Sequence, residues 1–526
     1  MWTRCQVPKS SKSARSNPGA RSANCVLPLI LTNSDVFATV RRFLMDSHYD
    51  EAAVCERLNL TNATDYLRLR PNPASPYAIR DSLDALVRLF LIGEIVEQSE
   101  LEPNIPAAMV EALAALGAIA RYPGRSMDWY ATAALYPAYG LYIVSDRWTS
   151  PEASPIQGAA DVVYPAITVN TAQFLETLPQ EPCESFLDLC AGTGIAALVA
   201  ASRYARHAWS ADITEAAAHC AEFNRRLNGV ENLTVVRGDL YDAVNDKTFD
   251  RIVANPPHMP SLKRAELWAD GGQLGDHITR RIIEGLPKYL VPGGRFYCVT
   301  AGPDRKGEGF EGRMRGWLGS HAPQFDVFLF ERRLFDPAQI AHQQAARTRG
   351  GLAEVDLWKE LFDQHEVEHI FYGPFVLEKK AIAGEPVTVR RRKGSRLGSP
   401  EIEWMRAWET AAAHPEMLRR LLESRPVAAR GLELHVVHKM HDGKLAPQRF
   451  TLQTEYPFEV ECSIQPWTAY LIGRCDGRTT GRQLLQFLKE NQFLATDEPE
   501  EQFADYLRDM VSGGFLEIEG FRLPAP

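Results

Sequence analysis

The sequence predicts an α/β fold in which helices cover a mainly parallel sheet. Between residues 185 and 331, short apolar runs alternate with helical periods, a pattern typical of strand-helix repeats. A Gly-x-Gly turn, Gly192 to Gly194, separates the first apolar run from a helical pattern. Asp212 and Asn255 stand where later runs end. Because the carboxyl ends of parallel strands share one edge of a sheet, these residues are expected at a common crevice.

Seven strands are expected in this sheet. Each is a short apolar run with helical text between it and the next, and a helical insert over residues 338–364 precedes the last one. The expected strands cover residues 185–189, 208–212, 233–237, 251–254, 295–300, 325–330 and 368–377.

Composition sets the broad class of protein. The 526 residues suffice for about three domains at roughly 150 residues each. Hydrophobic residues make up 45% and the net charge is -9, which indicates a globular chain without a global positive field for nucleic acid. The nine cysteines never form C-x-x-C, which argues against a zinc ribbon and against a disulfide framework, and no metal-binding residues are expected. No apolar stretch reaches the roughly 18 residues that span a bilayer, so we expect a cytoplasmic protein without a membrane segment.

The sequence divides into five predicted parts. Residues 1–45 form a basic, flexible tail, although its composition also matches an organelle transit peptide and a helical period begins at Val36. A helical, winged-helix-like domain is expected over 46–150, and the α/β domain covers 151–383. A basic linker and helix follow over 384–430. Predicted helices at 481–490 and 503–510 and a strand at 515–518 make 431–526 winged-helix-like, a shape that assigns no function by itself.

The glycine turn has the geometry of a nucleotide cradle. Gly192 and Gly194 let the backbone approach a ligand closely and adopt positive φ, and the following helix presents unpaired N–H groups. A dinucleotide fingerprint would place a third glycine where this chain has Ala197. That difference weakens the case for a nicotinamide cofactor, although alanine is tolerated at this position.

Two aspartates at strand ends are candidate nucleoside contacts. Asp212 follows Gly194 by eighteen residues, where a carboxylate can accept both hydroxyls of a ribose. The alternative is that Asp212 caps the helix that begins beside it. Asp239 ends the third strand and could meet an adenine amino group, or it is a turn residue after Gly238.

The segment Asn255-Pro256-Pro257-His258 carries the predicted chemistry. Two prolines end a central strand abruptly, because neither can donate to the ladder and each fixes φ. The Asn255 side chain and the Pro256 carbonyl are thereby held as acceptors at the sheet edge. Two rigid acceptors suit a planar NH₂ group, so an amide or amino nitrogen is the implied nucleophile. His258 is either a proton acceptor, a stacking partner of the substrate or part of the wall.

Together, the turn and the acceptor pair indicate methyl transfer from S-adenosylmethionine. In such a reaction the protein contributes mainly alignment, which supplies up to about 7 to 11 kcal/mol in favourable cases.

These residues resemble the motif series of class I S-adenosylmethionine-dependent methyltransferases: Asp188-x-x-x-Gly192-x-Gly194, Asp212, Asp239 and Asn255-Pro256-Pro257. Within that class, residues 155–305 are most similar to the release-factor glutamine methyltransferases and their small methyltransferase-domain relatives. Val163-Tyr164-Pro165-x-x-Thr168 and the stretch from Asp270-Gly271-Gly272 to Arg281 resemble further segments of that family. The resemblance implies a Rossmann-like seven-stranded methyltransferase sheet in residues 151–383.

The resemblance also implies a role for each residue. Asp188, Gly192 and Gly194 would border the methionine part of the cofactor, Asp212 its ribose and Asp239 its adenine. The full set of expected cofactor contacts is Asp188, Ala191, Gly192, Thr193, Gly194, Asp212, Ile213, Asp239, Leu240 and Asn255. The expected acceptor site is Asn255, Pro256, Pro257 and His258. The family usually carries Tyr or Phe where this chain has His258.

Three hypotheses about function remain open at this point. The first is methylation of a protein glutamine, with a release factor or a ribosomal protein as the macromolecular partner. The second is methylation of a nucleobase amino group in RNA or DNA, with the basic run 390–396 contacting phosphates. In the third, the sheet is a scaffold without cofactor between two binding modules.

Overall fold

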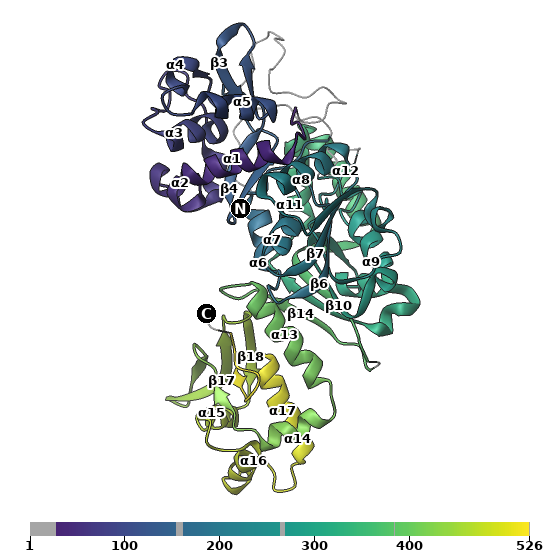
Figure 1. Cartoon of the computed structure of the whole chain (residues 1–526). Helices are drawn as coiled ribbons and strands as arrows, with labels where there is room; N and C mark the ends of the chain where they lie inside the picture. Colours follow the sequence, from purple (N-terminus) through teal and green to yellow (C-terminus); the bar gives the residue numbers. More distant parts are fainter. Residues whose placement is uncertain (1–27, 154–160, 263–268, 383, 525–526) are drawn as a thin grey trace. The chain divides into compact units, whose positions relative to one another are not determined.

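The structure is a computed structural model that describes residues 28–153, 161–262, 269–382 and 384–524 (Figure 1). These residues form two compact units. The first contains the chain up to Thr168 together with Gly192–Ile195 and Thr214–Glu231. The second contains the remaining residues to the C-terminal end of the described chain.

The first unit combines helices with a small antiparallel sheet of order β1-β3-β2 and a separate hairpin of β4 and β5. Its helices are α1 (Ser34–Asp46), α2 (Glu51–Leu58), η1 (Ala63–Arg68), α3 (Ser82–Leu86), η2 (Val87–Ile92), α4 (Gln98–Leu101), α5 (Ala107–Ala115) and α8 (Glu215–Asn228). Its strands are β1 (Val96–Glu97), β2 (Ile119–Tyr122), β3 (Arg125–Ala131), β4 (Ala134–Ala138) and β5 (Leu141–Ser145). The winged-helix-like description of residues 46–150 stays a prediction.

The tail predicted over residues 1–45 is wrong for its last part, because α1 lies within it. The Asn33 side chain accepts the amide of Val36 at 3.2 Å and caps the helix, and Phe37, Val40 and Leu44 are buried. The apolar residues at helical spacing therefore determine the structure of this segment, and its basic composition does not. Residues 1–27 of the predicted tail lie outside the described residues.

The second unit is built on a mixed sheet of nine strands in the order β14-β11-β13-β10-β9-β6-β7-β8, with β12 paired to β13. Its strands are β6 (Cys183–Leu189), β7 (Ala205–Asp212), β8 (Leu233–Arg237), β9 (Phe249–Ala254), β10 (Leu290–Arg305), β11 (Phe325–Glu331), β12 (Arg333–Phe335), β13 (Val367–Lys379) and β14 (Thr388–Arg392). Only β13 runs against the other strands of this sheet: it pairs antiparallel with β10, β11 and β12, and the other pairings are parallel. The predicted α/β fold and its seven strands are confirmed, and β12 and β14 add to them.

Alternate residues of the central strands form the main core. Leu187 and Leu189 of β6 belong to one buried cluster, and so do Ile252 and Ala254 of β9. Because side chains of a strand alternate between its two faces, this period of two places them on the same face of the sheet. The helices α9 (His277–Tyr289) and α10 (Phe310–Leu318) also contribute residues to this cluster, including Ile282 and Met314.

The helices of this unit follow the predicted gaps between strands. They are α6 (Val169–Glu176), α7 (Ile195–Arg203, whose first residue groups with the first unit), η3 (Leu240–Val244), α9 (His277–Tyr289), α10 (Phe310–Leu318), η4 (Gly319–Gln324), α11 (Pro337–Thr348) and α12 (Gly351–Gln364). The helical insert expected over 338–364 is confirmed as α11 and α12, which enclose a second buried cluster around Trp358.

The basic linker predicted after residue 383 is wrong, because β14 occupies its first part and pairs in parallel with β11. Its charges are neutralised by carboxylates of the same unit. Arg390 contacts Asp304 at 2.9 Å, and Arg391 contacts Glu409 at 3.0 Å. The remaining partners are Glu331 and Glu459 for Arg392 and Glu401 for Arg396. A run of arginines can therefore form an edge strand when carboxylates pair with its side chains.

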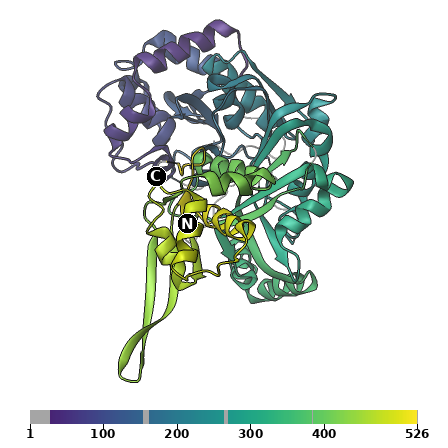
Figure 2. The same cartoon turned by 90° about the horizontal axis from the view of Figure 1, so that it is seen from below.

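The C-terminal part of the second unit continues with helices and a small antiparallel sheet of order β16-β17-β18. Its elements are α13 (Ser399–Ala412), α14 (Glu416–Glu423), β15 (Val427–Ala428), β16 (Glu433–His441), β17 (Lys444–Thr454), β18 (Val460–Ile464), α15 (Pro466–Ile472), α16 (Gly481–Glu490), α17 (Glu500–Ser512) and β19 (Leu516–Glu517). Figure 2 shows the hairpin of β16 and β17 extending from this part. The predicted helices and last strand are confirmed, and the winged-helix-like description stays a prediction.

Within the described residues, every helix is too short or too polar to cross a membrane.

Candidate active site

Asp188 lies near the carboxyl end of β6 with its side chain turned to the start of α7. Its carboxylate accepts the backbone amide of Ala197 at 3.2 Å, and the residue is only 3% exposed. Burial raises the pKa of Asp188 to about 8, against the lowering effect of the amide. Asp212 raises it further, because like charges disfavour ionisation. The carboxyl group therefore links β6 to α7. A nearby cation would favour its ionised form.

The backbone after Asp188 makes the tight turn that the sequence predicted. Cys190, Gly192 and Gly194 have φ of 57°, 55° and 77°. A Cβ atom built on Gly192 would meet nothing within 4 Å, so open space lies beside this backbone. The Thr193 carbonyl accepts Nδ2 of Asn224 at 3.1 Å, which fixes the turn from α8. Glycine serves here for its positive φ and for the access that it leaves to a ligand.

The aspartates at the ends of β6, β7 and β8 all influence the pKa of one thiol. Burial raises the pKa of Cys190 well above its usual value, and Asp212, Asp188 and Asp239 raise it further in that order. Arg281 lowers it. All three aspartates are therefore near enough to Cys190 to influence its thiol, and they come from the adjacent strands β6, β7 and β8.

Asp212 ends β7, and its carbonyl accepts the amide of Gly238 at 3.0 Å. The alternative that Asp212 caps the next helix is wrong, because Thr214 is the N-cap of α8 and accepts the amide of Ala217 at 3.0 Å. The neighbouring Ile213 is 52% exposed. The ribose role of Asp212 and the cofactor contact of Ile213 stay predictions.

Asp239 precedes η3 and forms a bidentate ion pair with Arg281 of α9, with distances of 3.1 and 2.9 Å. The sequence analysis did not identify this partner. A carboxylate offers about four lone-pair sites, so the pair leaves room for an adenine amino group. Leu240, the next residue, has a φ of 52° and is partly buried.

Asn255 follows β9 directly, and two polar side chains set its orientation. Nδ2 of Asn170 in α6 donates to Oδ1 of Asn255 at 3.2 Å. The Tyr372 hydroxyl in β13 donates to Oδ1 of Asn170 at 2.7 Å. Because a carbonyl oxygen has two lone pairs, Oδ1 of Asn255 keeps one acceptor position for a substrate.

The Pro256 carbonyl, the second predicted acceptor, bonds Nδ1 of His258 at 2.9 Å. A carbonyl only accepts, so Nδ1 carries the proton. Burial lowers the pKa of His258, which makes the neutral ring with a lone pair on Nε2 the dominant form near pH 7. The ring lies 5.8 Å from that of Tyr372, at an angle of 40°.

A short stretch of paired backbone fixes the chain beyond the prolines. Met259 bridges Asp270 in parallel, and the amide of Gly271 donates to the Met259 carbonyl at 3.0 Å. Gly275 has a φ of 85°, and a Cβ there would lie 2.6 Å from the His258 carbonyl. The glycine-rich stretch therefore packs directly against the Asn-Pro-Pro-His segment.

The residues of this edge fit S-adenosylmethionine. The open space beside Gly192 admits a ligand, and the carboxylates of Asp188 and Asp212 favour a cofactor that carries both a sulfonium and an ammonium group. Such a cation would favour the ionised form of Asp188, whose pKa is raised by burial.

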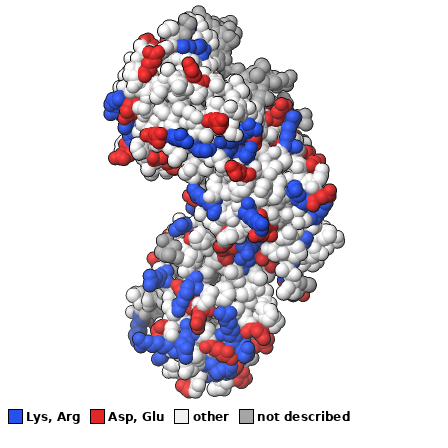
Figure 3. Space-filling model, in the orientation of Figure 1, with Lys and Arg blue, Asp and Glu red and all other residues white. Residues whose placement is uncertain are grey.

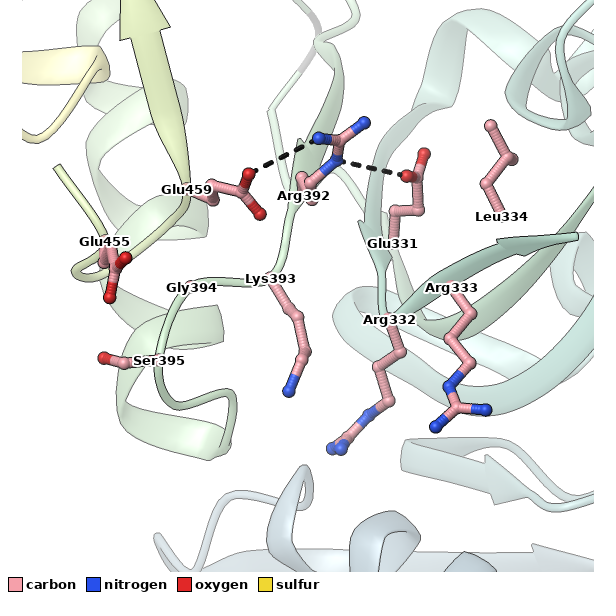
Figure 4. A pocket seen from close by; sticks show the side chains of 10 residues that line it. All are labelled: Glu331, Arg332, Arg333, Leu334, Arg392, Lys393, Gly394, Ser395, Glu455 and Glu459. Carbon is pink, nitrogen blue, oxygen red and sulfur yellow. Dashed lines mark hydrogen bonds and ion pairs between the residues drawn. The ribbon is translucent and has the colours of Figure 1, made fainter. Parts of the chain in front are cut away.

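A separate hollow of about 470 Å³ lies at the outer edge of the sheet (Figure 4). Arg332, Arg333 and Lys393 point in the same direction along it, whereas Arg392 is held by Glu331 and Glu459 at 3.5 and 3.4 Å. The hollow borders β12, whose register pairs Arg333 with Tyr372. It contributes no group to the acceptor pair.

Three residues of the site escaped the sequence analysis: Asn170, Arg281 and Tyr372. Asn170 follows the Tyr164-Pro165 segment by a few residues, so that segment pointed to its neighbourhood. Tyr372 lies in a strand that was predicted, but only the pairing of β13 with β12 and β10 brings its hydroxyl to α6. No local pattern marks such a residue.

Residues 164–306 match the methyltransferase small domain family. The matched segment is about a quarter of the chain. It holds every predicted site residue from Asp188 to His258, together with Asn170 and Arg281, whereas Tyr372 lies beyond it. The match and the names of the relatives support a class I S-adenosylmethionine-dependent methyltransferase that resembles the release-factor methylases, as the motif series predicted.

The curated relatives share this domain with the chain. A ribosomal protein uL3 glutamine methyltransferase from Bradyrhizobium diazoefficiens is 34% identical over 158 residues, which cover 28% of this chain and 50% of that protein. A release factor glutamine methyltransferase from Thermodesulfovibrio yellowstonii is 33% identical over 123 residues, or 21% of this chain and 44% of that protein. In each case the chain spans about half the length of the relative that it matches.

Among solved structures, the chain is similar to ribosomal protein L11 methylase from Lactobacillus delbrueckii, with 27% identity and a TM-score of 0.18. The overlap covers 23% of this chain and 51% of that one. So small an overlap carries no argument about function.

Proposed function

We propose that the chain transfers a methyl group from S-adenosylmethionine to the side-chain amide nitrogen of a protein glutamine. The observation that carries the proposal is the acceptor pair, Oδ1 of Asn255 and the Pro256 carbonyl. Each is oriented by one donor, at 3.2 and 2.9 Å, and each keeps one lone pair. The relatives named as glutamine methyltransferases support the same class of acceptor.

In this proposal the chain's residues hold both the cofactor and the acceptor. S-adenosylmethionine supplies an activated methyl group on a sulfonium. Asp188, Asp212, Asp239 and the turn at Gly192 would hold it. The two hydrogens of the target NH₂ donate to Asn255 and Pro256, which fixes the plane of the group and directs the nitrogen lone pair. Such alignment is the main source of rate in a displacement that needs no protein nucleophile.

The surplus proton of the methylated nitrogen leaves to water or to His258. Nε2 of His258 has a free lone pair in the neutral tautomer that the Pro256 carbonyl selects. Asn255 cannot take this proton, because an amide is not a base at neutral pH. The role of His258 is testable by the conservative variant His258→Gln, which should slow transfer if Nε2 is the acceptor and leave it unchanged if water is.

A nucleobase amino group is the alternative acceptor, and the charges do not favour it. The arginines of the basic run that could have contacted phosphates are paired with carboxylates, including Asp304 and Glu409. Lys393 of the same run lines the hollow of Figure 4. Basic and acidic side chains are interspersed over the face drawn in Figure 3. Nucleic-acid affinity depends on unpaired cations, so a protein acceptor fits better.

Labelled methyl transfer into a cell extract tests the proposal. The protein is incubated with methyl-labelled S-adenosylmethionine and extract, and portions are then treated with protease or nuclease. We expect label that protease releases and nuclease does not, and none with Asn255→Ala. Label that nuclease releases would assign a nucleobase instead. Calorimetry with S-adenosylmethionine would support the scaffold hypothesis if no binding were seen.

A further inference from the structure

We infer that Tyr372 is a positioning residue for both acceptors of the candidate site. Its hydroxyl acts on Asn255 through Asn170, and its ring acts on the Pro256 carbonyl through His258. The inference rests on the proposed function, because it assigns the residue that keeps the two acceptors aligned for a planar NH₂ group.

The first connection is a chain of two hydrogen bonds. The Tyr372 hydroxyl donates to Oδ1 of Asn170 at 2.7 Å, which turns Nδ2 of Asn170 toward Asn255. That Nδ2 donates to Oδ1 of Asn255 at 3.2 Å. If the Asn255 amide were flipped, two NH₂ groups would face each other without an acceptor between them. In the arrangement that the structure has, the chain therefore holds the Asn255 orientation in which oxygen, not nitrogen, belongs to the acceptor pair.

The second connection is a ring contact. The rings of Tyr372 and His258 have centroids 5.8 Å apart at 40°. Aromatic rings at this separation restrict each other's rotation. Nδ1 of His258 donates to the Pro256 carbonyl at 2.9 Å, and this bond depends on the ring plane. The Tyr372 side chain therefore contacts both Asn170 and His258, the hydrogen-bond partners of the two acceptors.

Tyr372 is itself held firmly by the sheet. Its carbonyl accepts the amide of Arg332 at 3.0 Å, and Arg333 is its partner in β12. Nη2 of Arg332 also reaches the Gln173 carbonyl in α6 at 3.5 Å. Arg332 therefore connects β13, which carries Tyr372, with the helix that carries Asn170. The spacing between the two side chains is set by this bridge.

Tyr372 lies outside the residues that match the methyltransferase small domain, which end at 306. The domain motifs therefore supply the acceptors and Asn170, whereas the part of the chain beyond the match supplies the group that orients them.

Two substitutions and a matched control test the inference. Tyr372→Phe keeps the ring and removes the hydroxyl, and Asn170→Ala removes the relay. With saturating labelled cofactor and extract protein, each should lower the transfer rate by about 3- to 10-fold, as loss of one hydrogen bond predicts. The double variant should be no slower than the slower single one, because both break the same chain. The S-adenosylmethionine dissociation constant should stay within about twofold.

Tyr297→Phe is the control, because it makes the same change in the neighbouring strand β10. Its hydroxyl bonds Oε1 of Glu403 at 2.6 Å and has no connection to the acceptors. We expect it to leave the transfer rate unchanged even where it lowers the melting temperature. Additive losses in the double variant, or an equal loss in Tyr297→Phe, would overturn the inference.

Hydrogen exchange separates this inference from the proposed function. In the peptide that covers residues 249–258, exchange should rise in Tyr372→Phe and Asn170→Ala but not in Tyr297→Phe. Unchanged exchange in Tyr372→Phe would overturn the positioning role. If the wild-type chain transferred no methyl group while exchange rose as expected, the proposed function would fail and the positioning role would stand.

Discussion

Asp188 is the residue whose protonation should report cofactor binding most directly. Burial raises its pKa to about 8, so the group is mostly protonated near pH 7. A positively charged cofactor favours the carboxylate, lowers this pKa and releases a proton. Affinity for S-adenosylmethionine should therefore be highest above pH 8 and fall as the pH is lowered through that value. Titration calorimetry in two buffers of different ionisation enthalpy measures the affinity and the released proton together.

Asp188→Asn is the control for this pH dependence. The amide cannot ionise, so the pH profile should flatten and proton release should disappear. Affinity that is independent of pH in the wild type would show that the buried carboxyl does not sense the cofactor. The same raised pKa predicts that this group makes the ligand-free fold less stable as pH rises from about 4 to 8, because the native state then binds the extra proton.

Asp212 should contribute affinity for the cofactor. If its carboxylate accepts the ribose hydroxyls, Asp212→Ala should weaken S-adenosylmethionine binding by about 1.5 to 3 kcal/mol, the range for hydrogen bonds to a charged group. The exposed Glu184, paired with Arg206 on the strand surface, provides a control substitution that should not change affinity. An unchanged dissociation constant in Asp212→Ala would remove the ribose assignment.

At the scale of single elements, glycine at position 373 allows β13 to pair closely with β11. A Cβ there would lie 2.1 Å from the Phe330 carbonyl, a backbone atom that cannot rotate away. Gly373→Ala should lower the free energy of unfolding by about 1 to 3 kcal/mol, the range for overpacked cores. It should also slow transfer, because Tyr372 precedes it. Gly316→Ala is the control, since a Cβ at Gly316 in α10 would meet nothing within 4 Å.

Urea unfolding of the two variants measures this difference. Equal midpoints for Gly373→Ala and Gly316→Ala would show that the sheet relaxes around the added methyl group.

The elements that could be predicted are those specified by local pattern. β8 and α16 lie where periodicity and turn residues placed them, because neighbouring residues determine them. β14 was missed because its three arginines indicate a solvent-exposed segment when read in sequence, and their carboxylate partners are distant along the chain. Likewise, the motifs predicted the strand-end aspartates and Asn255, whereas Asn170, Arg281 and Tyr372 depend on which strands pair and which helices pack.

At the scale of the whole second unit, one carboxylate joins the C-terminal part to the central sheet. Glu403 of α13 accepts from Arg295 at 3.1 Å, from Arg406 at 2.9 Å and from the Tyr297 hydroxyl at 2.6 Å. Arg406 still pairs with Glu378 at 2.6 Å when the Glu403 carboxylate is removed, so the loss falls mainly on Arg295 and on the Tyr297 hydroxyl. Glu403→Ala should therefore lower the free energy of unfolding by about 1 to 3 kcal/mol, the range for a buried polar group left without its partner.

The exposed pair of Arg206 and Glu184 provides the control for Glu403. Its side chains are 79% and 71% exposed, so Glu184→Ala should cost no more than about 1 kcal/mol. Urea midpoints compare the two variants. Similar small losses would mean that α13 is not fastened to the sheet through Glu403.

The account as a whole depends on the assignment of Asn255 to the methyl acceptor and not to the cofactor. The decisive measurement pairs labelled methyl transfer with calorimetry of S-adenosylmethionine on the variant Asn255→Ala. We expect transfer to be abolished while the cofactor dissociation constant stays within a few-fold of the wild-type value, since the lost oxygen mainly faces the acceptor. Equal loss of transfer and of cofactor affinity, or transfer that persists, would contradict the account.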